Sequence, residues 1–216
     1  MVSAGHEPQG TSEAGSGIRA TRPFDGAAFE AAVRALLAAC GVDDTKHMGQ
    51  TPERVRALWA ERMLDGYGQD AATALGEGFA DPRTDVVVVR GIAVHGVCPH
   101  HLLPFRGKAH VAYLPGGRLH GFGRIVRLVD ALAHRFTYQE WLTRDVADAL
   151  CTVGMAQGAA VVVETEQLCL SLGEQGRSDE RVVTQAFAGV FRDDAVRRAE
   201  IQRLVLPGSD PDRTAR

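Results

Sequence analysis

Residues 97–115 read VCPHHLLPFRGKAHVAYLP and join a group of reactive side chains to the start of a β-strand. Cys98, His100 and His101 lie within four positions, and an apolar step then leads into the segment 107–115. That segment has the residue types of a strand and ends at a Gly-Gly turn signal. The stretch therefore predicts a strand whose preceding loop carries candidate metal ligands or proton-transfer groups.

The segments on either side of this stretch predict helices and strands in separate runs. Apolar periodicity and turn signals predict helices at 25–41, 51–68, 124–136, 141–154 and 193–205. β-branched composition predicts strands at 84–97, 107–115, 158–166, 168–172 and 182–191, with a hairpin-like return at 116–117. This order favours an α+β fold with an antiparallel sheet and packed helices over a doubly wound fold.

The chain is predicted to form one domain between two tails. Residues 1–24 are rich in Gly, Ser and Glu without periodicity, which predicts a disordered N-terminal leader. Residues 25–205 form one continuous α+β pattern, and residues 206–216 resemble the leader, which predicts a flexible tail. The predicted strands leave long sheet edges, and edges are usually covered, so we expect a homo-oligomer.

The composition indicates a globular protein and excludes several partner classes. Of the 216 residues 45% are hydrophobic and 24% charged, and the formal net charge is −3, so we expect no nucleic acid and no membrane as partner. No signal peptide or membrane span is visible, which predicts a cytoplasmic protein. Its four cysteines, Cys40, Cys98, Cys151 and Cys169, are then expected to be thiols or ligands. Cys40 and Cys151, on apolar helix faces, are predicted to be core residues.

Three of the polar residues have the spacing of a metal site. Cys98 and His101 are three positions apart, and Cys169 is the best third candidate. Zinc accepts thiolate and imidazole ligands, and three protein ligands are typical of a catalytic rather than a structural zinc. The alternative is that the two cysteines are small buried residues and the histidines lie at strand ends. The spacing alone leaves both interpretations open.

The order of these motifs carries a family resemblance. CPHHLLPFRGKAHVAYLP resembles the signature C-E-H-H-L-L-P-F-x-G-x-x-H-V-A-Y-x-P of GTP cyclohydrolase I. The likeness continues through TPERV, RLVDALAHRFTYQEWLTRDVADAL, GAAVVVETEQLCL and GVFRDD, and covers roughly residues 28–205. It implies a T-fold that assembles into a ring, typically a decamer, with active sites at subunit interfaces. The implied reaction is zinc-assisted opening of the imidazole ring of GTP at C8, with release of formate and closure of a pterin ring.

The resemblance also assigns the reactive residues. Cys98, His101 and Cys169 align with the family's three ligands of Zn²⁺, and His100 aligns with a histidine that moves protons near the ring nitrogen. This assignment turns the open metal hypothesis into a specific one, with a neighbouring proton carrier.

A second set of residues is assigned to the substrate. Glu140 aligns with the carboxylate that recognises the N1 and 2-amino edge of guanine, with Gln139 beside it; a carboxylate can accept two parallel N–H bonds. Arg127 and Arg54 align with positively charged positions of the triphosphate site, and Arg124 stands where the family has a lysine. A guanine nucleotide or related purine is the implied substrate.

Several positions depart from the family pattern. Gln167 replaces a histidine two residues before the last zinc-binding cysteine, and glutamine cannot carry a proton near neutral pH. Gly173 replaces a phosphate-binding arginine, Leu170 a methionine, and Pro99 the glutamate of the signature. The departures leave the zinc ligands and base recognition in place and weaken the proton relay and the phosphate contacts.

These observations favour a zinc-dependent hydrolase that opens the imidazole ring of a guanine nucleotide or related purine at C8. Because Gln167, grouped with His100 as catalytic, and Gly173 affect two different functions, we expect an altered substrate or a reaction that stops before the pterin. The alternative is a true GTP cyclohydrolase I that makes dihydroneopterin triphosphate and formate. A non-catalytic ring-forming scaffold is a third reading, and the retained ligand set argues against it.

Overall fold

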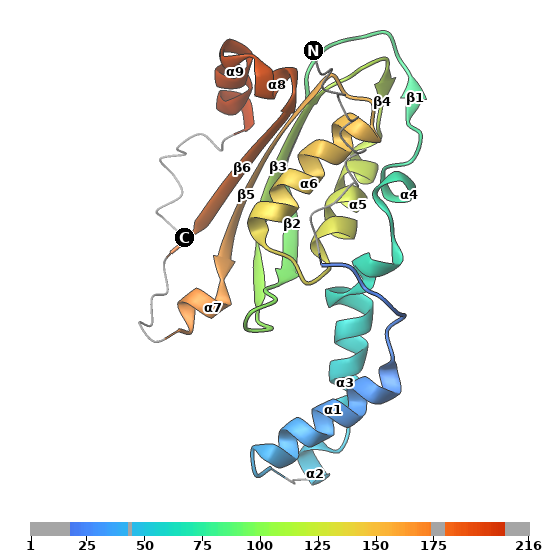
Figure 1. The fold of residues 1–216 in the computed structure, drawn as a ribbon, viewed down its shortest axis with the longest axis vertical. Helices are drawn as coiled ribbons and strands as arrows, with labels where there is room; N and C mark the ends of the chain where they lie inside the picture. The colour runs from blue at the N-terminus through green and yellow to red at the C-terminus, as the bar shows by residue number, and fades with distance from the viewer. Residues whose placement is uncertain (1–17, 43–44, 174–179, 206–216) are drawn as a thin grey trace, which may run out of the picture.

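The structure is a computed structural model that describes residues 18–42, 45–173 and 180–205. Most of the predicted leader and the whole predicted tail lie outside these residues. A four-stranded antiparallel sheet in the order β2-β3-β5-β6 forms the centre (Figure 1). Its strands are β2 (Val87–Val97), β3 (Pro104–Leu114), β5 (Gly158–Gln167) and β6 (Val182–Gly189). The predicted α+β class with an antiparallel sheet is confirmed.

Two long helices, α5 (Phe122–Ala133) and α6 (Gln139–Thr152), cover one face of this sheet (Figure 1). Their apolar sides form the main core with the strand residues that point to the same face. Ile125 and Leu128 are both 0% exposed, as the amphipathic pattern of α5 predicts. The sheet and α6 together position the site, because α6 begins at the end of the sheet where β5 finishes.

The opposite face of the sheet is covered only in part. Helices α8 (Val190–Asp193) and α9 (Ala195–Val205) pack there on a smaller core that includes Phe191 and Ile201. The rest of this face is polar and holds a cavity of about 620 Å³, lined in part by Arg106, Lys108 and Glu164. None of the predicted site residues lines this cavity.

The N-terminal helices project away from the sheet (Figure 1). Helix α1 packs on α3 but has no buried residue, and Cys40 at its end is exposed. The prediction that Cys40 lies in the core is therefore wrong, because α1 packs mainly on α3 and no residue of α1 is buried. Gly41 ends α1 with a φ of +75°. Val42 N then donates a hydrogen bond to Leu37 O at 3.0 Å. The helices of this region are α1 (Gly26–Ala39), α2 (Thr45–Met48) and α3 (Thr51–Leu58), whereas α4 (Ala71–Leu75) packs against α5.

The predicted helix 51–68 is divided into three pieces. After α3, a π-helical turn (Trp59–Met63) closes with a bond from Leu64 N to Trp59 O at 2.9 Å, and a 3₁₀ turn (Asp65–Gly68) follows. Gly66 lies so close to the carbonyl of His134 that an added Cβ would be 2.7 Å from it. The chain leaves the α-helical path here because it must pass closely over the end of α5.

Two further predictions of strand geometry are wrong. The segment 168–172 forms the helix α7 (Leu168–Ser171), because β5 loses its partner where β3 begins at Pro104, which has no backbone N–H. The chain after 116–117 does not return beside β3, since β2 and β5 already pair with both edges of that strand. Instead β4 (Arg118–Leu119) pairs with β1 (Phe79–Ala80) in a separate two-stranded sheet.

Candidate metal centre and active site

The loop that joins β2 to β3 is a closed turn that presents Cys98 and His101 together. Leu102 N donates to Cys98 O at 2.9 Å, and Cys98 N donates to Leu103 O at 2.9 Å. Leu102 has a φ of +56°, a left-handed conformation that is unfavourable for a branched side chain and is often found at functional sites. The turn therefore holds the two side chains, three positions apart, on the same side of the loop.

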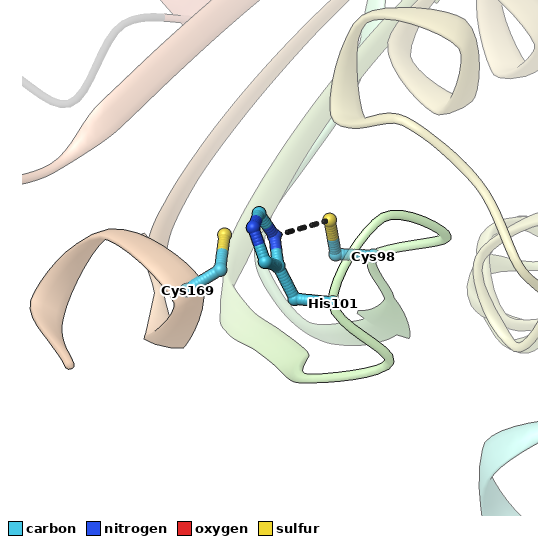
Figure 2. Close-up of side chains that lie close together, drawn as sticks. All are labelled: Cys98, His101 and Cys169. Atoms are coloured by element: carbon cyan, nitrogen blue, oxygen red, sulfur yellow. Dashed lines mark hydrogen bonds between the residues drawn. The ribbon is translucent and has the colours of Figure 1, made fainter. Parts of the chain in front are cut away.

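Helix α7 brings Cys169 to the same place from the end of β5 (Figure 2). The ligand atoms of Cys98, His101 and Cys169 all lie within 4.8 Å of one another, and Cys98 Sγ is 4.0 Å from His101 Nδ1. A tetrahedral zinc ion with normal bond lengths separates such atoms by about 3.5–3.8 Å. The donor set thus fits a zinc ion once the ligand atoms approach one another by up to about 1 Å.

The surroundings of the three ligands suit a metal that meets solvent. Cys98 is 8% exposed, Cys169 is half-buried, and His101 is exposed. Burial raises the pKa of the Cys169 thiol, and the neighbouring Cys98 raises it further. Since zinc binds the thiolate, metal binding at this site must release protons.

His100, the predicted proton carrier, lies beside the start of α6. Its Nε2 is 3.0 Å from the hydroxyl oxygen of Tyr138, and the two ring centres are 5.1 Å apart. Tyr138 in turn packs edge-on against Trp141 at 4.4 Å. Tyr138 was not among the predicted site residues, although it stands directly before Gln139 in the sequence.

Gln139 has a different role from the predicted base contact. It is 3% exposed, and its amide is used within the protein, where Nε2 donates to Val163 O at 2.9 Å and Oε1 accepts from Gln167 Nε2 at 2.7 Å. Its side chain therefore points into the fold rather than toward a ligand. Gln167 is half-buried at the end of β5, two residues before Cys169, and Thr165 also contacts its amide at 3.0 Å.

The remaining predicted residues lie on exposed helix faces. Glu140 is exposed in the first turn of α6, near the loop that carries His100. Arg124 and Arg127 are exposed on α5, and Arg54 on α3 donates to the side chain of Gln50 at 2.8 Å. Within the described parts of the chain, no hydrogen bond or ion pair joins these arginines to the cysteine–histidine group. One chain thus brings together Cys98, His101 and Cys169, while His100 adjoins His101 in sequence and Gln167 stands two residues before Cys169.

The fold and the site together define a class of protein. Two thiols and one imidazole from the end of an antiparallel sheet, with no fourth Cys, His, Asp or Glu ligand among the described residues, are typical of a catalytic metal site. A nearby histidine and carboxylate are the groups that metal-assisted hydrolysis needs. Among the described helices, none has the length and apolar character that crossing a membrane requires.

Comparison with known proteins gives the family. The family model described as GTP cyclohydrolase I matches residues 29–206, so the chain belongs to the GTP cyclohydrolase I family, hydrolases that act on a cyclic amidine. It is 60% identical over 193 residues to "GTP cyclohydrolase 1" of Ralstonia nicotianae, covering 89% of this chain and 92% of the relative. It is 59% identical over 189 residues to the protein of the same name from Chromobacterium violaceum, covering 87% and 92%.

More distant relatives carry the same name. The chain is 38% identical over 175 residues to "GTP cyclohydrolase 1" of Bacillus subtilis, which covers 80% of this chain and 92% of that protein. Among solved structures, the apo form of the archaeosine synthase QueF-Like matches with a TM-score of 0.35 and 22% identity, covering 50% of this chain and 96% of that one. That structural likeness is too weak to support an argument.

Proposed function

We propose that this chain is a zinc-dependent enzyme that opens the imidazole ring of GTP at C8 and forms dihydroneopterin triphosphate and formate. One observation carries the proposal: Cys98 and His101 on the β2–β3 loop meet Cys169 on α7 with all three ligand atoms within 4.8 Å. The near-complete likeness to relatives named "GTP cyclohydrolase 1" supports GTP as the substrate.

The metal ligands and the residues around them have different proposed roles in the reaction. A zinc ion held by the three ligands would supply Lewis acidity that polarises water and the substrate. His100 is placed to hold or move a proton at Nε2, and the hydroxyl of Tyr138 orients its ring. Glu140, exposed at the start of α6, would accept hydrogen bonds from N1 and the 2-amino group of guanine. These roles need only side chains that one chain brings to the same end of the sheet.

The triphosphate would be bound by Arg54, Arg124 and Arg127. These arginines lie on two exposed helices, so we propose that neighbouring chains of a ring, a homodecamer, complete the phosphate site. Two features support assembly. Strands β2 and β6 are the outer strands of the sheet, and α1 has an apolar side with no buried residue. The cytoplasm, a reducing compartment, would keep the four cysteines as the free thiols that the structure shows.

The decisive experiment is to incubate the zinc-loaded protein with GTP, GMP and guanosine and to identify the products by mass spectrometry. GTP should give formate and a pterin triphosphate, and GMP and guanosine should react more slowly because they lack the phosphates that the arginines bind. Absence of any change in GTP, with one zinc ion per chain, would refute the proposal.

A second candidate is a reaction that stops at the ring-opened formamide. It is favoured by Gln167, which stands where the family signature has a histidine and cannot carry a proton. In that case GTP would give a stable product without loss of formate, and the variant Gln167→His would proceed to the pterin. Pterin formation by the unaltered chain would exclude this candidate.

A further inference from the structure

The amide of Gln139 has an orientation that the backbone of the sheet dictates. Its Nε2 lies 2.9 Å from Val163 O and 3.0 Å from Val182 O, on β5 and at the start of β6. A backbone carbonyl can only accept a hydrogen bond, so the NH₂ group of Gln139 must face these two atoms. The Oε1 atom of Gln139 therefore faces the other way, toward the end of β5.

This orientation sets the direction of every bond that follows. Thr165 Oγ1 is 2.6 Å and Gln167 Nε2 is 2.7 Å from Gln139 Oε1, which can only accept, so both groups donate to it. Having donated its hydrogen, the Thr165 hydroxyl accepts from Gln167 Nε2 at 3.0 Å. The three side chains form a closed triangle in which Thr165 is 0% and Gln139 is 3% exposed.

The Gln167 amide nitrogen faces two acceptors of the triangle, Gln139 Oε1 and Thr165 Oγ1. The Oε1 atom of Gln167 is left over, and within the described residues no protein group donates to it. We infer that Gln167 is a fixed hydrogen-bond acceptor at the active site, and that Thr165 and Gln139 are positioning residues that hold its carbonyl oxygen in place. The role of Gln167 in the reaction rests on the proposed function, whereas the orientation of its amide does not.

The chemistry of a locked acceptor differs from that of the histidine it replaces. An imidazole can donate, accept or transfer a proton, whereas an amide oxygen held in one direction can only accept. The group it pairs with is then an O–H or N–H of the reacting water or of the opening purine ring. Gln167 orients that donor, and proton transfer stays with other groups of the site.

A double-mutant cycle tests the coupling between Thr165 and Gln167. Gln167→Met should lower kcat about 10- to 100-fold, and Thr165→Val about fivefold, because each removes hydrogen bonds that act on the reacting group. In the Gln167→Met background, Thr165→Val should have no further effect on kcat. Thr165→Ser, which keeps the hydroxyl, should retain wild-type kcat, and zinc content and KM for GTP should not change in any variant.

Thr184→Val is the matched control for disturbance of the network. The Thr184 hydroxyl contacts Gln139 Nε2 at 3.2 Å but does not contact Gln167, so this variant should keep its kcat. Equal effects of Thr165→Val on kcat in both backgrounds would overturn the inference, because they would show that Thr165 acts independently of Gln167. An unchanged kcat in Gln167→Met would overturn it as well.

Hydrogen exchange tests the hydrogen bonds of the Gln167 amide without measuring activity. In protein labelled with ¹⁵N-glutamine, the side-chain amide of Gln167 should exchange its hydrogens slowly, and Thr165→Val should speed this exchange about tenfold. Fast exchange in the unaltered protein would refute the lock. If exchange is slow but GTP is not converted, the proposed function fails while the assignment of the Gln167 amide stands.

Discussion

The metal ligands and the arginines of this molecule are assembled in different ways. Cys98 and Cys169 belong to segments that continue directly from β2 and β5, strands that β3 joins in a fixed antiparallel register. Arg54 and Arg127 project from the exposed faces of separate helices, α3 and α5. Strand register fixes where the ends of neighbouring strands lie relative to one another, whereas an exposed helix face remains available to a neighbouring chain. Within the described residues, one chain brings the three candidate metal ligands together, whereas no contact joins these arginines to them.

The largest expected effect comes from breaking the metal site. Cys169→Ala removes one of three ligands, so bound zinc should fall well below one ion per chain and turnover should fall about 1,000-fold or more, the loss of several kcal/mol of stabilisation. Zinc content is measured by atomic absorption and turnover by formate release.

Cys151→Ala is the matched control for this variant. Burial raises the pKa of the Cys151 thiol to about 11, and this side chain packs against the main core on α6. Its removal should leave zinc content unchanged. Normal activity in Cys169→Ala would contradict the view that the site is complete within one chain.

The second effect is the pH dependence of zinc affinity. Burial and then Cys98 raise the pKa of the Cys169 thiol in the metal-free protein, so zinc must displace a proton at neutral pH. Lower pH favours the protonated thiol, and zinc affinity should fall about tenfold or more per pH unit from pH 8 to pH 6. Competition with a chelator of known affinity measures it, and a pH-independent affinity would mean that the thiols are not ligands.

The third effect concerns the phosphate site. Arg127→Ala should raise the KM for GTP about 10- to 100-fold through loss of a charge-assisted bond, with little change for guanosine. Arg34→Ala is the control, since among the described residues this arginine pairs with Glu30 at 3.2 Å on α1. Equal losses for GTP and guanosine would show that Arg127 does not bind phosphate.

Mixed assemblies would sharpen the comparison further. If neighbouring chains share a site, an inactive Cys169→Ala chain refolded together with an Arg54→Ala chain should regain activity that neither has alone. No recovery would place both residues in a site made by one chain.

The smallest effect is expected at the hydroxyl beside His100. Tyr138→Phe removes the contact at 3.0 Å and should lower kcat about three- to tenfold, with zinc content unchanged, because the ring of His100 loses its orientation. Tyr67→Phe removes a hydroxyl that accepts from Phe136 N and not from His100, and should leave kcat unchanged. Equal effects in the two variants would contradict a specific role for Tyr138.

Much of the site could be predicted because its residues are close in sequence or follow a regular period. Cys98 and His101 are three positions apart within one turn, and the apolar side of α5 follows its helical period to Ile125 and Leu128. The segment 168–172 predicts a strand but forms the helix α7 (Leu168–Ser171), because a short apolar segment suits either structure and the loss of a strand partner beyond Phe105 decides between them.

The contacts that cross between elements could not be predicted. Tyr138 reaches His100 across 38 positions, and Gln139 reaches Thr165 and Gln167 across 26 and 28 positions. No local pattern encodes such distances. The inward direction of Gln139 in particular depends on two carbonyls of strands that pair only in the folded chain.

The sequence by itself determined the donor set, the α+β class and the family, because each depends on residue types and their order along the chain. Only the tertiary structure decided which of these residues meet and in what direction their polar atoms point. The physical reason is that a hydrogen bond has a donor and an acceptor side. The carbonyls of Val163 and Val182, which come together only in the folded sheet, determine which end of the Gln139 amide donates. The orientation of the Gln167 amide follows from that of Gln139.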